Sequence, residues 1–402
     1  MFQYAPKSKF EDIKDTIETS YGAKIEDIFS HFEKEPLSSA SIAQVHIATL
    51  KEGGQKVAVK VQHKWIAEDL HLDLDMLDFF IKLGHEIFPV FDFRWLSRNM
   101  KRSLPEELDF RIEAKNSENC AEMFKNDPFI KVPKVYKEHS NAKVMVMEFV
   151  EGINIDHFDE LVQNGYNLEE ICANLANCFT QQIFKFGAVH ADPHSGNVFV
   201  RKIEHQGRQR AQLVLLDHGL YRYLTKELRT AYSYLWQGII RRDSEMVTQA
   251  VKDIGIDEEY WALFASMVSQ KDYEKVVNSE EEIDMVEHLG VESEEERRHV
   301  KDQVGNYLTE ISECLRDMDP ELHLIFKVNN YLKTIDMRLG KPINSVYYTA
   351  KYSFEAVEEV EYPRLGWWGK VVFRARKFYT MYCLWFLNLF MTRKVDYHRH
   401  HR

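Results

Sequence analysis

Two short stretches carry residues whose types and spacing suit phosphoryl transfer. Residues 190–197 read His-Ala-Asp-Pro-His-Ser-Gly-Asn and place the acid Asp192 five positions before the amide Asn197. Residues 213–219 read Leu-Val-Leu-Leu-Asp-His-Gly and place a second acid, Asp217, between an apolar run and a glycine. In kinase-type phosphoryl transfer the first Asp accepts the proton of the nucleophile, while the Asn and the second Asp hold Mg²⁺. The pattern therefore predicts a magnesium–nucleotide site that contains these three side chains.

Residues 37–62 have the pattern of strands that would present a nucleotide to those acids. The segment begins with a loop of small residues at 38–41. An alternating strand, a glycine-containing hairpin turn and a second strand with Val-Ala-Val-Lys at 57–60 follow it. In a kinase N-lobe such a loop covers the phosphates, and the strand lysine, here Lys60, reaches them. The loop residues are Ser38, Ser39, Ala40 and Ser41. Without glycine, their Cβ atoms limit how closely the backbone approaches phosphate, so we expect altered nucleotide preference or slower chemistry.

The acid that would pair with Lys60 follows a long helical stretch. Residues 66–100 have helical periodicity, and Pro105 suits the start of the next helix, with acids near its positive end. The candidates, which spacing alone does not separate, are Glu107, Asp109 and Glu113. Acids in a first helical turn are also common without any function.

Most of the remaining chain is predicted to be helical. Residues 9–33 have the spacing of one or two helices that end at Pro36. Residues 142–149 are expected to form a strand that leads into an adenine-binding hinge, with Glu148 and Val150 beside the base.

The segment after Asp217 departs from protein kinases. Residues 220–251 read directly as helix, and no Ala-Pro-Glu motif follows. His194 also stands where protein kinases often place a lysine, two residues after the catalytic acid. Both features favour a small-molecule, lipid-related or ATPase activity over the phosphorylation of other proteins.

Composition limits the other classes of function. The 402 residues are 45% hydrophobic, and the net charge of -12 argues against nonspecific nucleic-acid binding. The five cysteines are scattered and odd in number, which fits a reducing compartment better than a disulfide framework or a zinc site. Neither a signal peptide nor an Arg-rich mitochondrial presequence is visible at the N-terminus.

The most apolar run, residues 378–391, has basic neighbours on both sides. It is shorter than the roughly 20 residues that a membrane span needs. We expect a C-terminal helix that packs on the main domain. The alternative is an interfacial membrane contact by residues 366–391.

Five ordered motifs together resemble one family, the UbiB or aarF-domain-containing atypical kinases, over about residues 6–350. They lie at residues 38–46, 57–62, 107–113, 190–197 and 217–219. The resemblance implies an α+β, two-lobed kinase-like fold with a helical N-lobe insert and a largely helical C-lobe. The expected boundaries are 1–36 for an N-terminal helical segment, 37–150 for the N-lobe with its insert at 66–118, 151–360 for the C-lobe, and 361–402 for an apolar helix and basic tail.

The resemblance also implies roles for the candidate residues. Residues 38–41 correspond to an alanine-rich loop over ATP, and Lys60 would contact the phosphates and pair with Glu113. Asp192 matches the catalytic acid. The E-x-D element near the active site corresponds to Glu107 and Asp109, and the Mg²⁺ ligands correspond to Asn197 and Asp217.

Two features depart from the family pattern. The K-x-G-Q element has no match, and family members carry sequence upstream of residue 1, so a shortened form is expected. The metal triplet is Asp-His-Gly, which places His218 beside the site. By resemblance, the protein is expected in mitochondria, with roles in quinone or other lipid handling and inner-membrane upkeep, and with membrane lipid, prenyl-lipid or mitochondrial proteins as partners.

Two other interpretations stay open. A pseudokinase scaffold would bind nucleotide or partners without turnover, as the glycine-free loop suggests. A hydrolase metal cluster for zinc or iron would use five side chains, although it leaves Lys60 and the hinge unexplained. These side chains are His190, Asp192, His194, Asp217 and His218.

Overall fold

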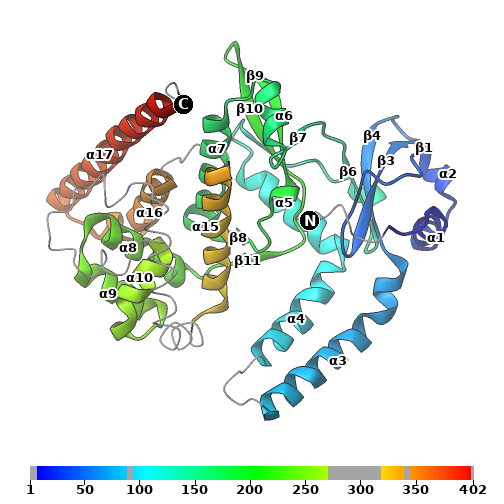
Figure 1. Ribbon diagram of the computed structural model, residues 1–402, viewed down its shortest axis with the longest axis horizontal. Helices are drawn as coiled ribbons and strands as arrows, with labels where there is room; N and C mark the ends of the chain where they lie inside the picture. The colour runs from blue at the N-terminus through cyan, green and yellow to red at the C-terminus, as the bar shows by residue number, and fades with distance from the viewer. Residues whose placement is uncertain (1–6, 88–93, 270–317, 339–344, 400–402) are drawn as a thin grey trace. The chain divides into compact units, whose positions relative to one another are not determined.

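The computed structural model describes residues 7–87, 94–269, 318–338 and 345–399 (Figure 1). The chain forms two compact units, each with its own core. The first unit comprises Met1–His157, Ser195–Ile203 and Gln212–Tyr221. The second comprises Phe158–His194, Glu204–Ala211 and Arg222–Arg402. Helices accompany mainly antiparallel sheets, which confirms the predicted α+β class.

An antiparallel sheet dominates the first unit, with the strand order β1-β3-β4-β6 and with β2 paired to β3. The strands are β1 (Phe29–Phe32), β2 (Ser38–Ser39), β3 (Ala43–Leu50), β4 (Lys56–Gln62) and β6 (Val144–Glu148). One face packs on α1 (Phe10–Tyr21) and α2 (Ile25–Ile28), and Val57, Val59 and Val61 are fully buried in that core. Since side chains alternate along a strand, Lys60 lies on the opposite face.

The prediction of helix over residues 9–33 is wrong for its last residues. Helices α1 and α2 form as expected, but Phe29 takes an extended conformation directly after α2 and begins β1. Phe29 pairs with Leu50 of β3 and is only 3% exposed. A pairing partner about twenty positions away therefore overrides the local helical spacing.

Three helices follow β4 in the first unit. Helices α3 (Lys64–Ile87) and α4 (Arg94–Glu107) run side by side as a pair (Figure 1), and α5 (Phe110–Met123) comes next. The prediction that Pro105 starts a helix is wrong, because Pro105 lies inside α4 near its end. Asp109 starts α5 instead, and its side chain accepts a hydrogen bond from the Arg111 amide at 3.0 Å. An aspartate cap satisfies a first-turn N–H, which is why the helix restarts there.

A second sheet has the order β5-β10-β9-β7. Its strands are β5 (Ile130–Lys131), β7 (Ile153–Asn154), β9 (Val198–His205) and β10 (Arg208–Leu215). The tight turn that joins β9 to β10 has positive φ at Gln206 and Gly207, as a two-residue hairpin turn requires. Short 3₁₀ turns flank these strands at Lys137–His139 (η2) and Ser195–Asn197 (η4). Because the hairpin brings both strand ends back to one edge, it sets the residues just before β9 beside those just after β10.

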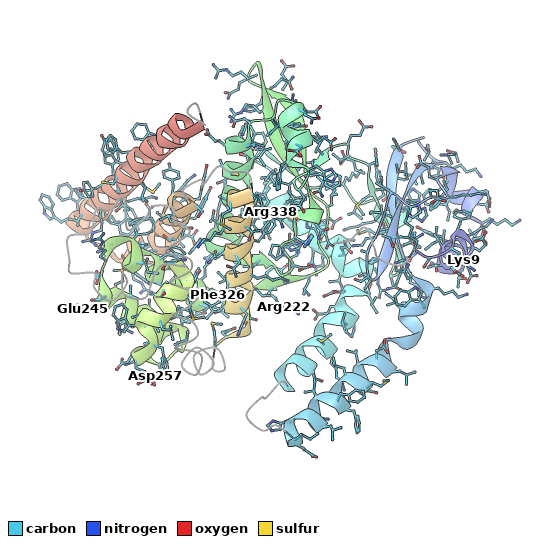
Figure 2. The ribbon with its side chains drawn as sticks, in the orientation of Figure 1. Lys9, Arg222, Glu245, Asp257, Phe326 and Arg338 are labelled. Carbon is cyan, nitrogen blue, oxygen red and sulfur yellow. The ribbon has the colours of Figure 1, made fainter. Side chains whose placement is uncertain are left out.

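The second unit is largely helical. Its first elements are α6 (Phe158–Gln163), α7 (Leu168–Thr180), a π-helical turn η3 (Gln181–Phe186) and the short strand β8 (Ala188–His190), which pairs with β11 (Tyr221–Tyr223). The helices that follow are α8 (Lys226–Arg241), α9 (Ser244–Ile254), η5 (Glu258–Tyr260), α10 (Trp261–Ser269), α15 (Pro320–Arg338), α16 (Ser345–Glu361), η6 (Tyr362–Arg364) and α17 (Trp367–Arg399). Figure 2 labels Phe326 on α15, whose ring packs edge-on against Phe264 of α10 at 5.7 Å.

The expected single helix over residues 220–251 is wrong in detail. It divides into β11, α8 and α9. The break falls at Arg242, which adopts the left-handed conformation, and Asp243 then caps α9 by accepting a hydrogen bond from Met246. The break lets α8 and α9 fold back on each other, and this packing outweighs the helical periodicity that runs through both.

Candidate active site

Lys60 and Glu113 form a buried ion pair in the first unit. The Lys60 Nζ lies 2.6 Å from Glu113 Oε1 and 2.8 Å from Oε2, so the ammonium binds both carboxylate oxygens. The side chains are 13% and 2% exposed, respectively. Strand β4 directs Lys60 away from the valine core, and the first turn of α5 presents Glu113. The pairing expected from the resemblance is therefore present, and it selects Glu113 from the three candidate acids.

A third charge belongs to the same cluster. Asp217 Oδ1 lies 3.4 Å from Lys60 Nζ, so one ammonium faces two carboxylates. Burial lowers the pKa of Lys60, but the charges of Glu113 and Asp217 outweigh it, so the pKa lies above its ordinary value. Burial raises the pKa of Glu113 to about 7, with Asp217 adding to the rise and Lys60 opposing it. The lysine therefore stays charged, and Glu113 is the carboxylate that takes up a proton near neutral pH.

An apolar shell surrounds this pair. The Phe110 ring, fully buried, has its centroid 5.3 Å from the Lys60 Nζ. Phe110 belongs to a cluster with Ala58 and Met145 from the facing strands. Low polarity around the pair strengthens the attraction between the charges and makes the loss of either partner costly.

Asn197 and Asp217 meet at one edge of the second sheet. The Asn197 Nδ2 donates a hydrogen bond to Asp217 Oδ2 at 3.0 Å, and the Leu216 amide donates to the Asn197 carbonyl at 3.0 Å. Asp217 Oδ1 also accepts from the Gly219 amide at 3.2 Å. Asn197 precedes β9 and Asp217 follows β10, so the hairpin itself brings them together. Their oxygen donors, an amide and a carboxylate, are of the type that Mg²⁺ prefers.

The residues around this edge are fixed by hydrogen bonds. Asn154 Nδ2 donates to the carbonyls of Ser195 and Gly196, and Ser195 Oγ donates to Asp156. His218 is 2% exposed, and its ring nitrogens lie 3.1 Å from Tyr221 Oη and 3.1 Å from the Leu215 carbonyl. Hence His218 has a packing role that explains the unusual residue in the Asp-His-Gly triplet.

Asp192 belongs to the second unit and lies two residues after the end of β8. Its amide donates to His190 Nδ1 at 3.1 Å, which stabilises the turn of the loop. Its carboxylate Oδ1 lies 2.6 Å from the Nζ of Lys327 on α15. Sequence reasoning missed Lys327, because nothing in the motif points to a residue 135 positions away.

The loop predicted to cover the phosphates is a short strand and a turn. Ser38 and Ser39 pair with Val45 and Gln44 as β2, and the Ala40 amide donates to the Ala43 carbonyl at 2.8 Å. His63 Nε2 lies 3.0 Å from the Ala40 carbonyl. The Ala40 amide is therefore engaged inside the loop.

The other predicted nucleotide contacts have structural partners. Asp109 caps α5 and pairs with Arg111 at 2.6 Å, and this hydrogen-bonded pair lowers the pKa of Asp109. Glu148 ends β6, where it binds Lys131 at 2.6 Å and accepts from the Lys134 amide at 3.1 Å.

Two more predicted contacts, Glu107 and Val150, complete the set, and the alternative metal cluster of the hydrolase interpretation finds no support in the described residues. Glu107 is the last residue of α4, and both Glu107 and Val150 are half-buried. Among the described residues, no three His, Cys, Asp or Glu side chains gather as they would around a metal ion. The hydrolase interpretation of the two motifs therefore has no geometric basis in this part of the chain.

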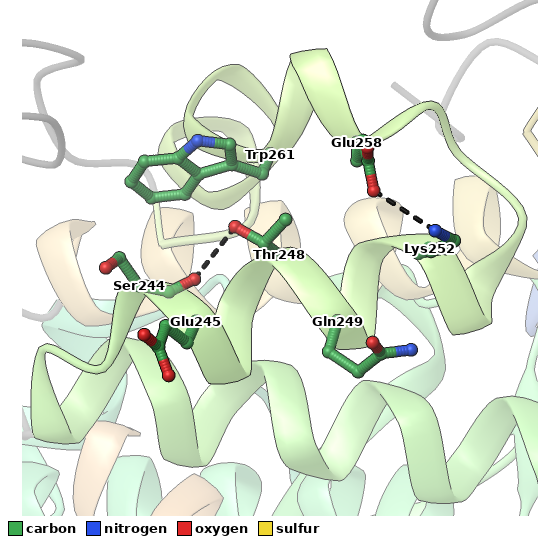
Figure 3. A pocket seen from close by; sticks show the side chains of 7 residues that line it. All are labelled: Ser244, Glu245, Thr248, Gln249, Lys252, Glu258 and Trp261. Carbon is green, nitrogen blue, oxygen red and sulfur yellow. Dashed lines mark hydrogen bonds and ion pairs between the residues drawn. The ribbon is translucent and has the colours of Figure 1, made fainter.

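A surface pocket of about 360 Å³ lies in the second unit. It is formed by α9, η5 and the start of α10 (Figure 3). Its lining residues are Ser244, Glu245, Thr248, Gln249, Lys252, Glu258 and Trp261. None of them belongs to a predicted motif. Lys252 and Glu258, which both line it, pair with each other at 3.2 Å, which is ordinary surface chemistry.

None of the described helices has a stretch that is long and apolar enough to cross a membrane. Helix α17 contains the whole apolar run found in the sequence, and side chains are described only as far as Phe386.

Comparison with known proteins gives a consistent result. Residues 1–251 match the family model described as the ABC1 atypical kinase-like domain. An ABC1 protein of Arabidopsis thaliana is 32% identical over 97% of this chain and 75% of its own length. The mouse AarF domain-containing protein kinase 1 is 36% identical over 84% of this chain, which spans 62% of that relative.

A solved structure shows the same fold. The complex of the Mycobacterium tuberculosis protein Rv3197 with erythromycin superposes with a TM-score of 0.59 over 85% of this chain and 82% of that chain, at 20% identity. The predicted family and kinase-like fold are thereby confirmed. With the family model covering more than half of its length, the chain belongs to the ABC1, or AarF-domain, family of atypical kinase-like proteins.

Proposed function

We propose that the chain binds ATP with Mg²⁺ and acts as an atypical kinase or ATPase. One observation carries the proposal: the bidentate Lys60–Glu113 pair shares a buried cluster with Asp217, which is hydrogen-bonded to Asn197. Kinase-type phosphoryl transfer requires a lysine–glutamate pair and an acid–amide metal pair. A structural ion pair alone would not need the second pair beside it.

Each residue has a distinct task in this proposal. Lys60 binds nucleotide phosphate oxygens while Glu113 holds the ammonium in place. Asn197 and Asp217 hold Mg²⁺, which neutralises charge on the β- and γ-phosphate oxygens when bound. Asp192 accepts the proton of the attacking hydroxyl or water. Further nucleotide contacts are proposed for residues 38–41, the E-x-D acids Glu107 and Asp109, and the hinge residues Glu148 and Val150.

The decisive experiment compares ATP turnover by the wild type and by Asp192→Asn. The Asp192 side chain is 53% exposed, so the amide replacement leaves folding intact while it removes the proton acceptor. We expect turnover to fall by about 100-fold or more, with nucleotide affinity retained. Lys60→Ala should instead lose affinity for nucleotide. Full ATP consumption by Asp192→Asn would refute the catalytic assignment.

A pseudokinase scaffold is the second candidate, and one contact favours it. The Ala40 amide, in the loop expected over the phosphates, donates to Ala43 and is engaged before any nucleotide arrives. A scaffold would bind Mg²⁺–ATP in calorimetry yet release no ADP above the rate of Asp192→Asn. ADP release that depends on Asp192 excludes it.

We place the acceptor among lipids or small molecules, in a mitochondrial setting connected with quinone or lipid homeostasis. The missing Ala-Pro-Glu motif and His194 support a non-protein acceptor, and the family supports the setting. Mitochondrial proteins and prenyl-lipids are the proposed partners. Fractionation of cells that express the full-length tagged protein tests the location, and co-sedimentation with a nuclear or cytosolic marker would contradict it.

Helix α17 is the proposed membrane-contacting element. Phe373 and Leu384 are buried, and Phe373 packs against Phe354 and Val357 of α16. The aromatic side chains left exposed on its described part are Trp367, Trp368, Phe378, Tyr379, Tyr382, Trp385 and Phe386, with exposures of 43–73%. Exposed basic side chains lie among them at Arg374 and Arg376. Aromatic and basic groups on one helix suit an interface with anionic lipid.

Vesicle flotation tests this contact. We expect the wild type to float with vesicles that contain phosphatidylglycerol and to remain in solution with phosphatidylcholine alone. The triple variant Trp368→Ala, Phe378→Ala, Tyr382→Ala should lose flotation. A control that removes exposed aromatics from α3, Phe79→Ala with Phe80→Ala, should keep it. Equal flotation of the triple variant and the wild type would exclude α17 as the contact.

A further inference from the structure

We infer that Lys327 is a catalytic residue. Its ammonium stabilises the phosphoryl group during transfer to the acceptor hydroxyl that Asp192 deprotonates. The Lys327 Nζ lies 2.6 Å from Asp192 Oδ1 and 3.4 Å from the Ala191 carbonyl. Protein kinases often supply a cation at this point from two residues after the acid, where this chain has His194. The inference rests on the proposed function, in which Asp192 accepts the proton.

Three contacts to different helices fix the segment of α15 that carries Lys327. Its neighbour Phe326 packs against Phe264 of α10, and Asn329 Nδ2 donates to Tyr232 Oη of α8 at 3.1 Å. The Tyr331 ring packs edge-on against Phe179 of α7 at 5.5 Å. The segment of α15 around Lys327 is therefore rigid, as a preorganised catalytic group requires.

The pair has no evident role in stability. Lys327 and Asp192 are 51% and 53% exposed, and ion pairs so open to water contribute little to folding. The contrast with Lys60, which is 13% exposed and enclosed by apolar side chains, is marked. A solvated ammonium exchanges its partner readily, so Lys327 can turn from Asp192 to an incoming phosphate oxygen at small cost.

The chemistry places negative charge close to this ammonium. The acceptor oxygen forms a bond to the γ-phosphorus, the bond from that phosphorus to the β–γ bridging oxygen breaks, and ADP leaves with the electron pair. The acceptor proton passes to the Asp192 carboxylate. An acceptor oxygen within hydrogen-bond reach of Asp192 lies about 3 Å from that carboxylate, and Lys327 touches the same carboxylate. The phosphoryl oxygens therefore come within reach of Lys327, which neutralises their charge.

Two measurements on the full-length chain test this role, one with and one without turnover. Calorimetry with Mg²⁺ compares ADP with a non-hydrolysable ATP analogue that carries the γ-phosphoryl group. Lys327→Ala should weaken binding of the analogue by about tenfold more than binding of ADP, because only the analogue offers the γ-phosphoryl oxygens. ATP turnover should fall by about 100-fold or more. Lys327→Arg, which keeps a cation, should recover part of both.

Lys333→Ala is the matched control, since it removes one lysine from the same helix. It should bind both nucleotides like the wild type. An equal loss of ADP and analogue affinity in Lys327→Ala, or turnover that stays the same or rises, would overturn the inference. The wild type could also bind the analogue through Lys327, as shown by the selective loss in Lys327→Ala, and yet turn over no ATP. In that case the proposed catalysis fails, while the contact of Lys327 with the γ-phosphoryl group stands. If the wild type binds neither nucleotide, both fall.

Discussion

Replacing Lys60 by methionine should destabilise the first unit, because the change leaves Glu113 and Asp217 without their counter-charge. Methionine keeps the volume of the side chain and removes only the ammonium. Removing one partner of a buried ion pair costs about 3–5 kcal/mol. Solvent cannot replace the lysine at the Glu113 side chain, which is only 2% exposed. We therefore expect the loss in the free energy of unfolding to fall inside that range.

The loss should depend on pH with a definite sign. The pKa of Glu113 is raised to about 7 in the folded wild type, and it rises further when the ammonium is removed. A carboxyl whose folded pKa is raised makes the protein less stable as pH rises from the unfolded pKa to the folded one. The wild type therefore stops losing stability near pH 7, whereas Lys60→Met continues to lose about 1.4 kcal/mol per pH unit. The difference between them should grow above pH 7.

Amide hydrogen exchange in β3, β4 and β6 measures this difference in the intact chain. Corrected for intrinsic rates, it gives the opening free energy of the first unit, whereas one melting temperature would mix two units. Lys56→Met is the matched control on the same strand. Lys56 is exposed, and its ammonium lies 4.2 Å from the centroid of the Phe149 ring, so its loss should cost less than about 1 kcal/mol.

The double variant Lys60→Met with Glu113→Leu sharpens the test. Removing both charges should restore most of the lost stability, because no unpaired carboxylate remains at 2% exposure. A Lys60→Met variant as stable as the wild type at pH 8, or a loss independent of pH from 7 to 9, would show that these charges are solvated. The reasoning on the buried pair would then be wrong.

Three further changes probe separate parts of the molecule. The wild type should lose up to about 3 kcal/mol of stability as pH rises from the unfolded pKa of Glu113 to about 7. Glu113→Gln should abolish this loss, measured by amide exchange in β4. An unchanged dependence on pH in the variant would assign the loss to another group. Gly238→Ala should destabilise the α8–α9 pair by about 1–3 kcal/mol, because a Cβ there would lie 2.7 Å from Val247 Cγ2, and urea unfolding checks it; wild-type stability would contradict the close approach. Asn197→Ala should weaken Mg²⁺-dependent nucleotide binding about tenfold and leave metal-free binding unchanged, in calorimetry with and without Mg²⁺; equal losses in both would remove Asn197 from the metal site.

The meeting of Asn197 and Asp217 could be predicted from sequence for a local reason. Two strands joined by a turn at Gln206 and Gly207 must return to one edge. The lengths of the two strands then set the register of the residues just outside them. The proposed metal pair is thus encoded within about twenty residues of chain, which is the range over which turn chemistry and alternation are informative.

The choice of Glu113 over its neighbours depends on where one helix ends and the next begins. Glu107 is the last residue of α4, and the carboxylate of Asp109 caps α5 and pairs with Arg111. Glu113 is the acid that remains in the first turn of α5 for Lys60. Pro105 misleads a sequence argument here, because α4 continues past it, and helix boundaries are the least reliable part of such arguments.

Lys327 marks the point where the motif stops being sufficient. With His194 in place of the usual lysine, the sequence shows that the local cation is missing, but it contains 52 lysines and arginines that could supply another. The contact that selects Lys327 spans 135 positions and exists because Phe326, Asn329 and Tyr331 anchor α15 to three other helices. That packing is cooperative and has no local pattern. Because Lys327 is carried on another helix, its charge can be removed without altering residues 190–197. Lys327 is therefore a more selective probe of phosphoryl transfer than any residue inside the motif.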